Sequence, residues 1–275
     1  MKTGSLLAIT GGHAVDLDAF GAMVDAICDE LGWVWSHATQ PSAQRWLRAE
    51  HAHEWDAILL HDLPGLTLKR GTEPAPTDPT DEIRTGMLEL LAAGQGIVAT
   101  HHALAGWPTW DGWAALLGGR FLYAPGRLRG ADWPSSGYRM DRYRVDVLAA
   151  DHPVCAGVEA FELHDELYLC PVFDDEVVPL LTTTADTSPE SMTSTYHEVR
   201  HGEQMAARGH PPGSKLIGWA KTAGRSPLVY LLPGHGPETM AHPQYRRLLS
   251  NAIKWVGSPE AHEWAAANPT KISDL

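Results

Sequence analysis

The hydrophobic pattern of the chain alternates between short apolar runs and stretches with helical spacing. Four apolar runs bounded by glycine, proline or histidine have the pattern of strands buried on both faces: residues 6–10, 55–61, 96–101 and 227–234. Between the early runs, apolar residues recur at intervals of three and four, which predicts amphipathic helices. Strands that alternate with helices indicate βαβ units and a parallel sheet covered on both faces.

Glycines and capping residues mark where these helices are expected to begin and end. In the first helix, residues 20–31 carry the apolar face, with Asp18 as the expected N-cap and Gly32 as the stop. The other helices are expected at residues 80–94, 110–118 and 245–257.

The pattern changes in the second half of the chain. Residues 138–147 alternate between polar and apolar, as a half-exposed strand does, and several short strands follow. We therefore expect an α/β fold with three layers, built on a doubly wound, mostly parallel sheet with added antiparallel strands. No repeat or clear linker divides the chain, so residues 1–275 are interpreted as a single domain with a core at about residues 5–257.

Two long segments look irregular and are expected to be loops that act as lids or are locally disordered. Residues 64–80 are rich in proline, threonine and glycine, and residues 182–214 contain His197, His201 and His210, which are interpreted as solvated loop histidines.

Composition excludes some classes of partner. Lysine and arginine total 21 against 34 aspartate and glutamate, a net charge of −13, which argues against nucleic-acid binding. No apolar stretch approaches the roughly 18 residues of a membrane span or has the form of a signal sequence, so we expect a cytoplasmic protein without a membrane partner. Cys28, Cys155 and Cys170 are odd in number and lack CxxC spacing, which fits a reducing compartment.

Histidines follow four of the predicted strands. They are His13, His61, the pair His101 and His102, and His235. A single histidine at a strand end is more often a surface or packing residue. However, parallel strands place their carboxyl ends at one crevice, where ligands bind. We therefore expect a site built on His13, His101 and His235, with His102 and His61 as further substrate contacts.

Carboxylates and aromatic residues add to this candidate site. Asp165 and Glu166, followed by Tyr168, could supply a general acid or base, a metal ligand or hydrogen bonds to sugar hydroxyls, although a solvated turn is an equal alternative. Trp107 directly follows the histidine turn and is a candidate platform for a sugar ring. Trp110 and Trp113 have helical spacing and are assigned to the core.

Several familiar motifs are missing from the sequence. There is no GxGxxG after the first strand, no GxxxxGK[ST], no HExxH, no paired CxxC and no GxSxG. Dinucleotide binding, nucleoside triphosphate binding, the strong zinc signatures and a serine nucleophile therefore have no support.

Five segments carry a family resemblance: TGGH (10–13), GIVATHHALAGWPTWDGWAALLGGRF (96–121), DHPVCAGVEAFELHDELYL (151–169), PLVYLLPGH (227–235) and HPQYRRLLSNAIKWV (242–256). In this order and spacing they resemble the ThuA-like (trehalose utilisation) family, which has the flavodoxin-like, class I glutamine amidotransferase-like fold. In the amidotransferases a cysteine occupies the elbow after the strand, and a His-x-Glu pair activates it. Here His101 occupies the elbow and Glu238 stands three positions after His235, so glutaminase chemistry is not expected.

The resemblance implies action on a sugar or keto-glycoside in carbohydrate catabolism, as a hydrolase or a lyase. His101, His13 and His235 would be catalytic together with Asp165 or Glu166, because imidazoles titrate near neutral pH. In a variant of this hypothesis, His13, His101 and His235 bind a divalent zinc, manganese or iron ion.

Two alternatives remain open from the sequence. The first is a noncatalytic sugar-binding or regulatory module on the same fold. The second, glycoside hydrolysis by two carboxylates, ranks last because Asp165 and Glu166 would point to opposite faces of a strand. The expected partner is a small carbohydrate, and a homodimer is expected only because such dimers are the commonest oligomers.

Overall fold

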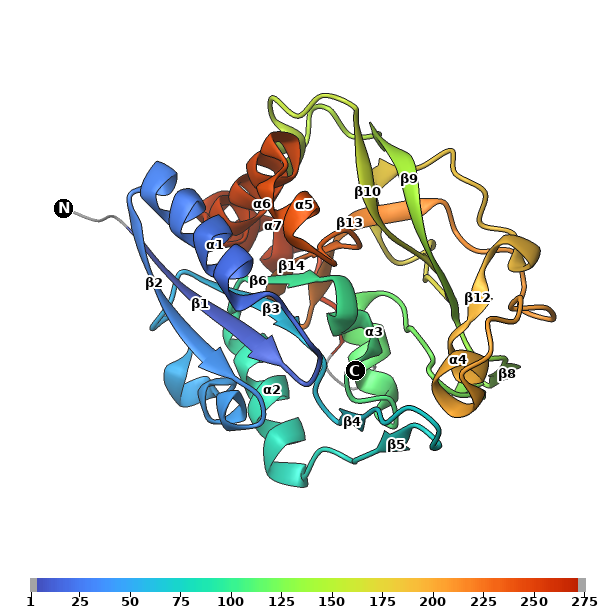
Figure 1. The fold of residues 1–275 in the computed structure, drawn as a ribbon. Helices are drawn as coiled ribbons and strands as arrows, with labels where there is room; N and C mark the ends of the chain where they lie inside the picture. The colour runs from blue at the N-terminus through green and yellow to red at the C-terminus, as the bar shows by residue number, and fades with distance from the viewer. Residues whose placement is uncertain (1–3, 272–275) are drawn as a thin grey trace.

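The chain folds around one ten-stranded sheet (Figure 1). The computed structural model describes residues 4–271. The strands of the sheet are β1 (Gly4–Gly11), β2 (Trp33–Thr39), β3 (Ala57–Asp62), β6 (Ile97–Thr100), β9 (Gly137–Val147), β10 (Phe161–Leu169), β11 (Val178–Thr182), β12 (Thr193–Ser194), β13 (Leu216–Ala223) and β14 (Ser226–Leu231). Their order is β10-β9-β11-β13-β14-β6-β3-β1-β2, with β12 beside β9. Two small hairpins lie outside the sheet, formed by β4 (Leu66–Thr67) with β5 (Ala75–Pro76) and by β7 (Gly126–Leu128) with β8 (Ala131–Trp133).

The sheet has a parallel half and an antiparallel half. Strands β2, β1, β3, β6 and β14 are parallel neighbours. From β14 outward, β13, β11, β9 and β10 pair antiparallel. The prediction of an α/β fold with a parallel sheet and added antiparallel strands is confirmed.

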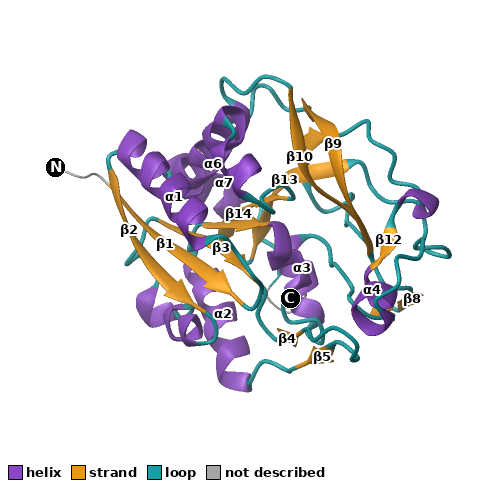
Figure 2. Cartoon of the chain, viewed as in Figure 1, coloured by secondary structure: helices purple, strands orange, loops and turns teal. Residues whose placement is uncertain are grey.

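Helices cover both faces of the parallel half. The α-helices are α1 (Leu17–Leu31), α2 (Asp81–Ala93), α3 (Asp111–Leu117), α4 (Thr195–His201), α5 (Pro237–Ala241), α6 (Pro243–Val256) and α7 (Pro259–Ala267). Short 3-10 turns lie at Ser42–Trp46, Ala49–His51, His101–Ala105, Pro153–Cys155 and Pro189–Ser191. Figure 2 shows α1 and α6 on one side of the parallel strands and α2 and α3 on the other, which makes three layers.

The helix ends agree with the predicted stop signals, but one N-cap was wrong. Gly32, Gly94 and Gly118 all close their helices in the left-handed conformation. At the start of α1, Asp16 is the N-cap because its side chain accepts the N–H of Ala19 at 2.9 Å. Asp18 lies inside the first turn, where its negative charge still favours the helix N-terminus.

The two long irregular segments contain some regular structure. Residues 64–80 include the β4–β5 hairpin, and residues 182–214 include β12 and α4. The expectation that the histidines of this second segment are solvated is wrong for His210, which is 4% exposed. Across residues 4–271, no helix combines the length and the apolar character that crossing a membrane requires.

The order of the parallel strands brings the histidine turns together. β14, β6, β3 and β1 are adjacent and parallel, so their carboxyl ends lie at the same edge of the sheet. The turns after these ends carry the histidines of the candidate site.

Candidate functional site

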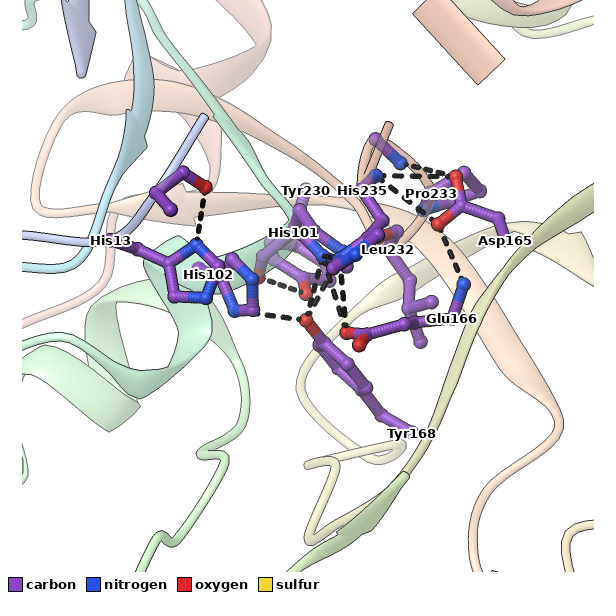
Figure 3. A network of polar contacts seen from close by, with 12 residues as sticks. His13, His101, His102, Asp165, Glu166, Tyr168, Tyr230, Leu232, Pro233 and His235 are labelled. Atoms are coloured by element: carbon purple, nitrogen blue, oxygen red, sulfur yellow. Dashed lines mark hydrogen bonds and ion pairs between the residues drawn. The ribbon is translucent and has the colours of Figure 1, made fainter. Parts of the chain in front are cut away.

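Four histidine rings gather at the carboxyl edge of the sheet (Figure 3). The ring centroids of His13 and His102 lie 3.6 Å apart, and those of His101 and His102 lie 4.1 Å apart. His235 joins the group with its ring 5.2 Å from that of His101. Turns after three strands of the sheet therefore meet in one place.

His101 sits at a sharp elbow between β6 and the 3-10 turn that follows it. Its backbone has φ 52°, a left-handed conformation that is uncommon for residues other than glycine. Two contacts hold the residue: its Nδ1 lies 2.9 Å from the carbonyl oxygen of Leu232, and its own carbonyl accepts the hydroxyl of Tyr230 at 2.9 Å. Because Nδ1–H donates to Leu232, the lone pair of Nε2 points into the site.

Glu166 completes a triangle of ligand-type atoms with His101 and His235. Its carboxylate oxygen Oε2 lies 3.4 Å from His101 Nε2 and 3.4 Å from His235 Nδ1, and those two nitrogens are 3.1 Å apart. Burial alone would raise the pKa of Glu166, but hydrogen bonds and charges from His101 and His235 outweigh it and lower the pKa. The hydrogen bond with Glu166 in turn raises the pKa of His235, against the effect of burial.

Asp165 lies on the opposite face of β10 from Glu166 and contacts backbone groups. Its carboxylate is fully buried and accepts the backbone N–H of Gly234 at 2.9 Å and that of His235 at 3.1 Å. Strand β10 therefore contacts the His235 turn at two points. Asp165 accepts hydrogen bonds from the backbone of the turn, and Glu166 contacts the His235 ring. Asp165 was predicted to be a catalytic carboxylate; in the structure its carboxylate accepts backbone N–H groups of the His235 turn.

The donor atoms fit a divalent metal ion. One ligand atom each from His101, His102, Glu166 and His235 lies within 4.8 Å of the others. A tetrahedral zinc ion with ligands at about 2.0–2.2 Å separates them by about 3.4 Å, close to the distances within the triangle. His102 Nε2 is also buried without a hydrogen-bond partner in the described part of the chain. Of the predicted ligands, His13 is outside this group.

The remaining predicted contacts divide between the site and its surroundings. The Tyr168 hydroxyl lies 3.1 Å from His101 Nε2 and 3.2 Å from His102 Nδ1. His61 lies behind the site, where Nδ1 contacts the Thr100 hydroxyl at 2.8 Å and burial lowers its pKa to about 3. Trp107 is 6% exposed and lines a second cavity, apart from the histidines.

A cavity of about 260 Å³ opens beside the histidines. His13, His102, Glu166 and Tyr168 line it, and all four are among the residues expected at the site. Sequence reasoning missed the rest of the lining, which is Phe121, Tyr123, Tyr138, Leu68, Arg70, Thr195, Glu198 and Val199. Tyr138 could have been found from the alternation of polar and apolar residues along β9. The residues from the two segments that appeared irregular are Leu68, Arg70, Thr195, Glu198 and Val199.

Comparison with known proteins gives the family. The profile described as ThuA, trehalose utilisation, matches residues 21–256. The chain belongs to the ThuA family. Its description relates the family to carbohydrate metabolism.

Two solved structures show the same ThuA-like fold. A ThuA-like protein from Parabacteroides merdae ATCC 43184 aligns with a TM-score of 0.65 at 15% identity, over 98% of this chain and 92% of that one. A ThuA-like protein from Bacteroides uniformis ATCC 8492 aligns with a TM-score of 0.61 at 20% identity, over 92% and 91%. A glutamine amidotransferase from Thermotoga maritima has a TM-score of 0.47 at 11% identity, over 93% and 98%. No curated protein matches the sequence.

Proposed function

We propose that this ThuA-family protein is a divalent-metal-dependent enzyme that acts on a sugar or keto-glycoside. The observation that carries the proposal is the triangle of His101 Nε2, His235 Nδ1 and Glu166 Oε2, with sides of 3.1, 3.4 and 3.4 Å. Zinc, manganese and iron all accept imidazole and carboxylate ligands. The metal would act as a Lewis acid on a substrate oxygen.

The residues of the chain have separate tasks in this proposal. His101, His235 and Glu166 hold the ion, with His102 as a fourth candidate ligand. Tyr168 reaches the same place with a hydroxyl that can donate a hydrogen bond to substrate. His13 lines the cavity, and its Nδ1 contacts the Ala14 carbonyl oxygen at 2.7 Å. The Nε2 atom of His13 is therefore the acceptor available for a substrate proton.

Support for a carbohydrate substrate comes from the family and from the cavity. The family description is trehalose utilisation. Phe121, Tyr123 and Tyr168 give the cavity aromatic surfaces of the kind that pack against sugar C–H groups, and polar groups lie among them.

The experiment joins metal analysis to turnover. Purified full-length protein should contain about one metal ion per chain, and exhaustive chelation should abolish turnover of trehalose, other glucosides or their 3-keto derivatives, with recovery when metal is restored. His101→Ala should lose metal. His164→Ala, which removes an exposed histidine from the same strand as Glu166, should keep it.

Two results would decide against the proposal. A fully active, metal-free preparation would exclude the metal. Binding of the sugars without conversion of any of them would favour a noncatalytic sugar-binding module instead.

A further inference from the structure

The wall of the cavity is built by the two segments that looked irregular in the sequence. Residues 64–80 contribute Leu68 and Arg70, and α4 contributes Thr195, Glu198 and Val199. The segments are joined to each other: the Gly71 N–H donates to the Val199 carbonyl at 2.8 Å, and Arg200 Nε lies 2.7 Å from a Glu73 carboxylate oxygen. They therefore form one wall of the cavity.

This wall presents a carboxylate with little compensating charge. Glu198 accepts a hydrogen bond from the Tyr138 hydroxyl, and its other carboxylate oxygen lies 3.9 Å from Arg70. The Arg70 side chain is 82% exposed, so solvent screens this ion pair. Burial, Glu166 and Glu198 together raise the pKa of Tyr123, which also lines the cavity. In the proposed function Glu166 is a ligand of the metal ion, so Glu198 is the carboxylate that this wall presents to the cavity.

A buried polar atom in the lining lacks a partner in the protein. Thr195 is 3% exposed, and its hydroxyl makes no hydrogen bond to any residue in the range 4–271. Buried polar groups are normally satisfied, so an atom of this kind beside a cavity indicates a ligand with hydroxyl groups. Thr195 and Glu198 are three residues apart on α4 and share a face of the helix.

The size of the cavity limits what it encloses. Its volume of about 260 Å³ is below the roughly 300–1,000 Å³ of pockets that hold drug-sized ligands. One sugar ring suits this space better than two.

We propose that the Thr195–Glu198 face of α4 determines substrate choice by accepting a single neutral sugar ring and rejecting rings that carry a carboxylate or a phosphate. Glu198 accepts hydrogen bonds from ring hydroxyls and repels anions, and the Thr195 hydroxyl pairs with a neighbouring hydroxyl group. The inference rests on the proposed action on a carbohydrate and deepens it.

The test compares a neutral probe with anionic probes of the same ring. Binding of methyl α-D-glucopyranoside, its glucuronide counterpart and glucose 6-phosphate to the full chain is measured by ligand-observed NMR, with zinc and without it. Metal-free wild-type protein should prefer the neutral glucoside by about tenfold or more, which is about 1.4 kcal/mol. Bound zinc should reduce that preference, because its positive charge attracts anions. Glu198→Gln keeps the shape of the side chain and should remove most of that preference. Glu203→Gln, an exposed carboxylate after the same helix, should leave it unchanged.

Thr195→Val tests the second contact. The hydroxyl has no partner among the described residues, so its loss should leave the melting temperature unchanged or raised while affinity for the glucoside falls several-fold. Equal or tighter binding of an anionic probe by metal-free wild-type protein would overturn the inference, as would an unchanged preference in metal-free Glu198→Gln. Unchanged glucoside affinity in Thr195→Val, or no binding of any probe by folded protein, would also overturn it. A neutral-sugar preference in protein that binds no metal would overturn the proposed metal enzyme and leave this inference standing.

Discussion

At the scale of single residues, the site depends on side chains that position other side chains. His101 keeps a left-handed backbone, which costs on the order of 1–3 kcal/mol, and hydrogen bonds to Leu232 and Tyr230 hold it there. Asp165 accepts hydrogen bonds from the backbone of the His235 turn and so holds that turn in place. Such supporting contacts usually matter for metal affinity nearly as much as the ligands do.

Asp165→Asn should therefore weaken both the fold and the metal site. The amide replaces one of the two accepting oxygens with an NH₂ group and so leaves a backbone N–H without its acceptor, which should lower the free energy of unfolding by about 1–3 kcal/mol. Because the His235 turn is loosened, metal affinity should fall about tenfold or more. Urea unfolding and zinc titration measure the two effects. Asp151→Asn, at an exposed aspartate, should change neither, and unaltered zinc affinity in Asp165→Asn would contradict the positioning role.

Tyr168→Phe should separate substrate contact from metal binding. The variant keeps all four candidate ligands, so the metal should still bind when it is supplied in excess. Under those conditions kcat/KM for a sugar substrate should fall about tenfold, the effect of one hydrogen bond. Steady-state kinetics with metal analysis measures this. Tyr143→Phe is the matched control, because that buried hydroxyl has no partner within residues 4–271 and its removal should leave kcat/KM unchanged. Equal kinetics in both variants would exclude a role for Tyr168.

At the scale of helices and strands, the sequence predicted elements whose local signals were uninterrupted. The four apolar runs correspond to β1, β3, β6 and β14. Two strands of the same sheet were missed for physical reasons. β2 is an edge strand with polar, partly exposed positions, and β13 contains Gly218 and Lys221, which interrupt its apolar run.

Gly12 allows the tight turn that follows β1 and leads to His13. Its φ is +77°, and a Cβ there would lie 1.9 Å from the Leu63 carbonyl oxygen at the end of β3. Gly12→Ala should therefore lower the free energy of unfolding by about 2 kcal/mol or more, because both the backbone strain and the clash involve main-chain atoms.

Gly21→Ala is the control for this prediction. Gly21 lies inside α1 with open space around its Cβ position, so alanine should stabilise the protein by about 0.5–1 kcal/mol. Urea unfolding measures both variants. A neutral Gly12→Ala would show that the turn can move away from β3.

At the scale of the whole molecule, the meeting of the histidine turns at one edge of the sheet was predictable, and the residues that complete the cavity were not. Histidines after parallel strands were expected to meet, and the strand order brings His13, His101 and His235 together. The alternation of a strand also separates Asp165 from Glu166, as their adjacency predicted. By contrast, α4 lies at the cavity and contacts residues 64–80. No local sequence pattern predicts such a tertiary contact.

Lys221 tests the cost of a buried charge to the stability of the whole protein. It is 3% exposed on β13, its ammonium group donates to the Ala115 carbonyl at the end of α3, and burial, followed by the charge of Arg129, lowers its pKa to about 8. Its pKa in the unfolded chain is about 10.4. The native state therefore binds this proton more weakly than the unfolded state does. Protonated Lys221 disfavours folding below pH 8, and this penalty is relieved as the pH rises from about 8 to about 10.5.

Lys221→Met should accordingly raise the free energy of unfolding at pH 7 by about 1–3 kcal/mol, because methionine fills the space without a charge to desolvate. The gain should shrink at pH 10, where the wild-type lysine is largely neutral in the native state. Urea unfolding at both pH values measures the difference, and Lys254→Met, at an exposed position of α6, should change stability by less than about 0.5 kcal/mol at either pH. A loss of stability in Lys221→Met at pH 7 would mean that the hydrogen bond to Ala115 outweighs the burial of the charge.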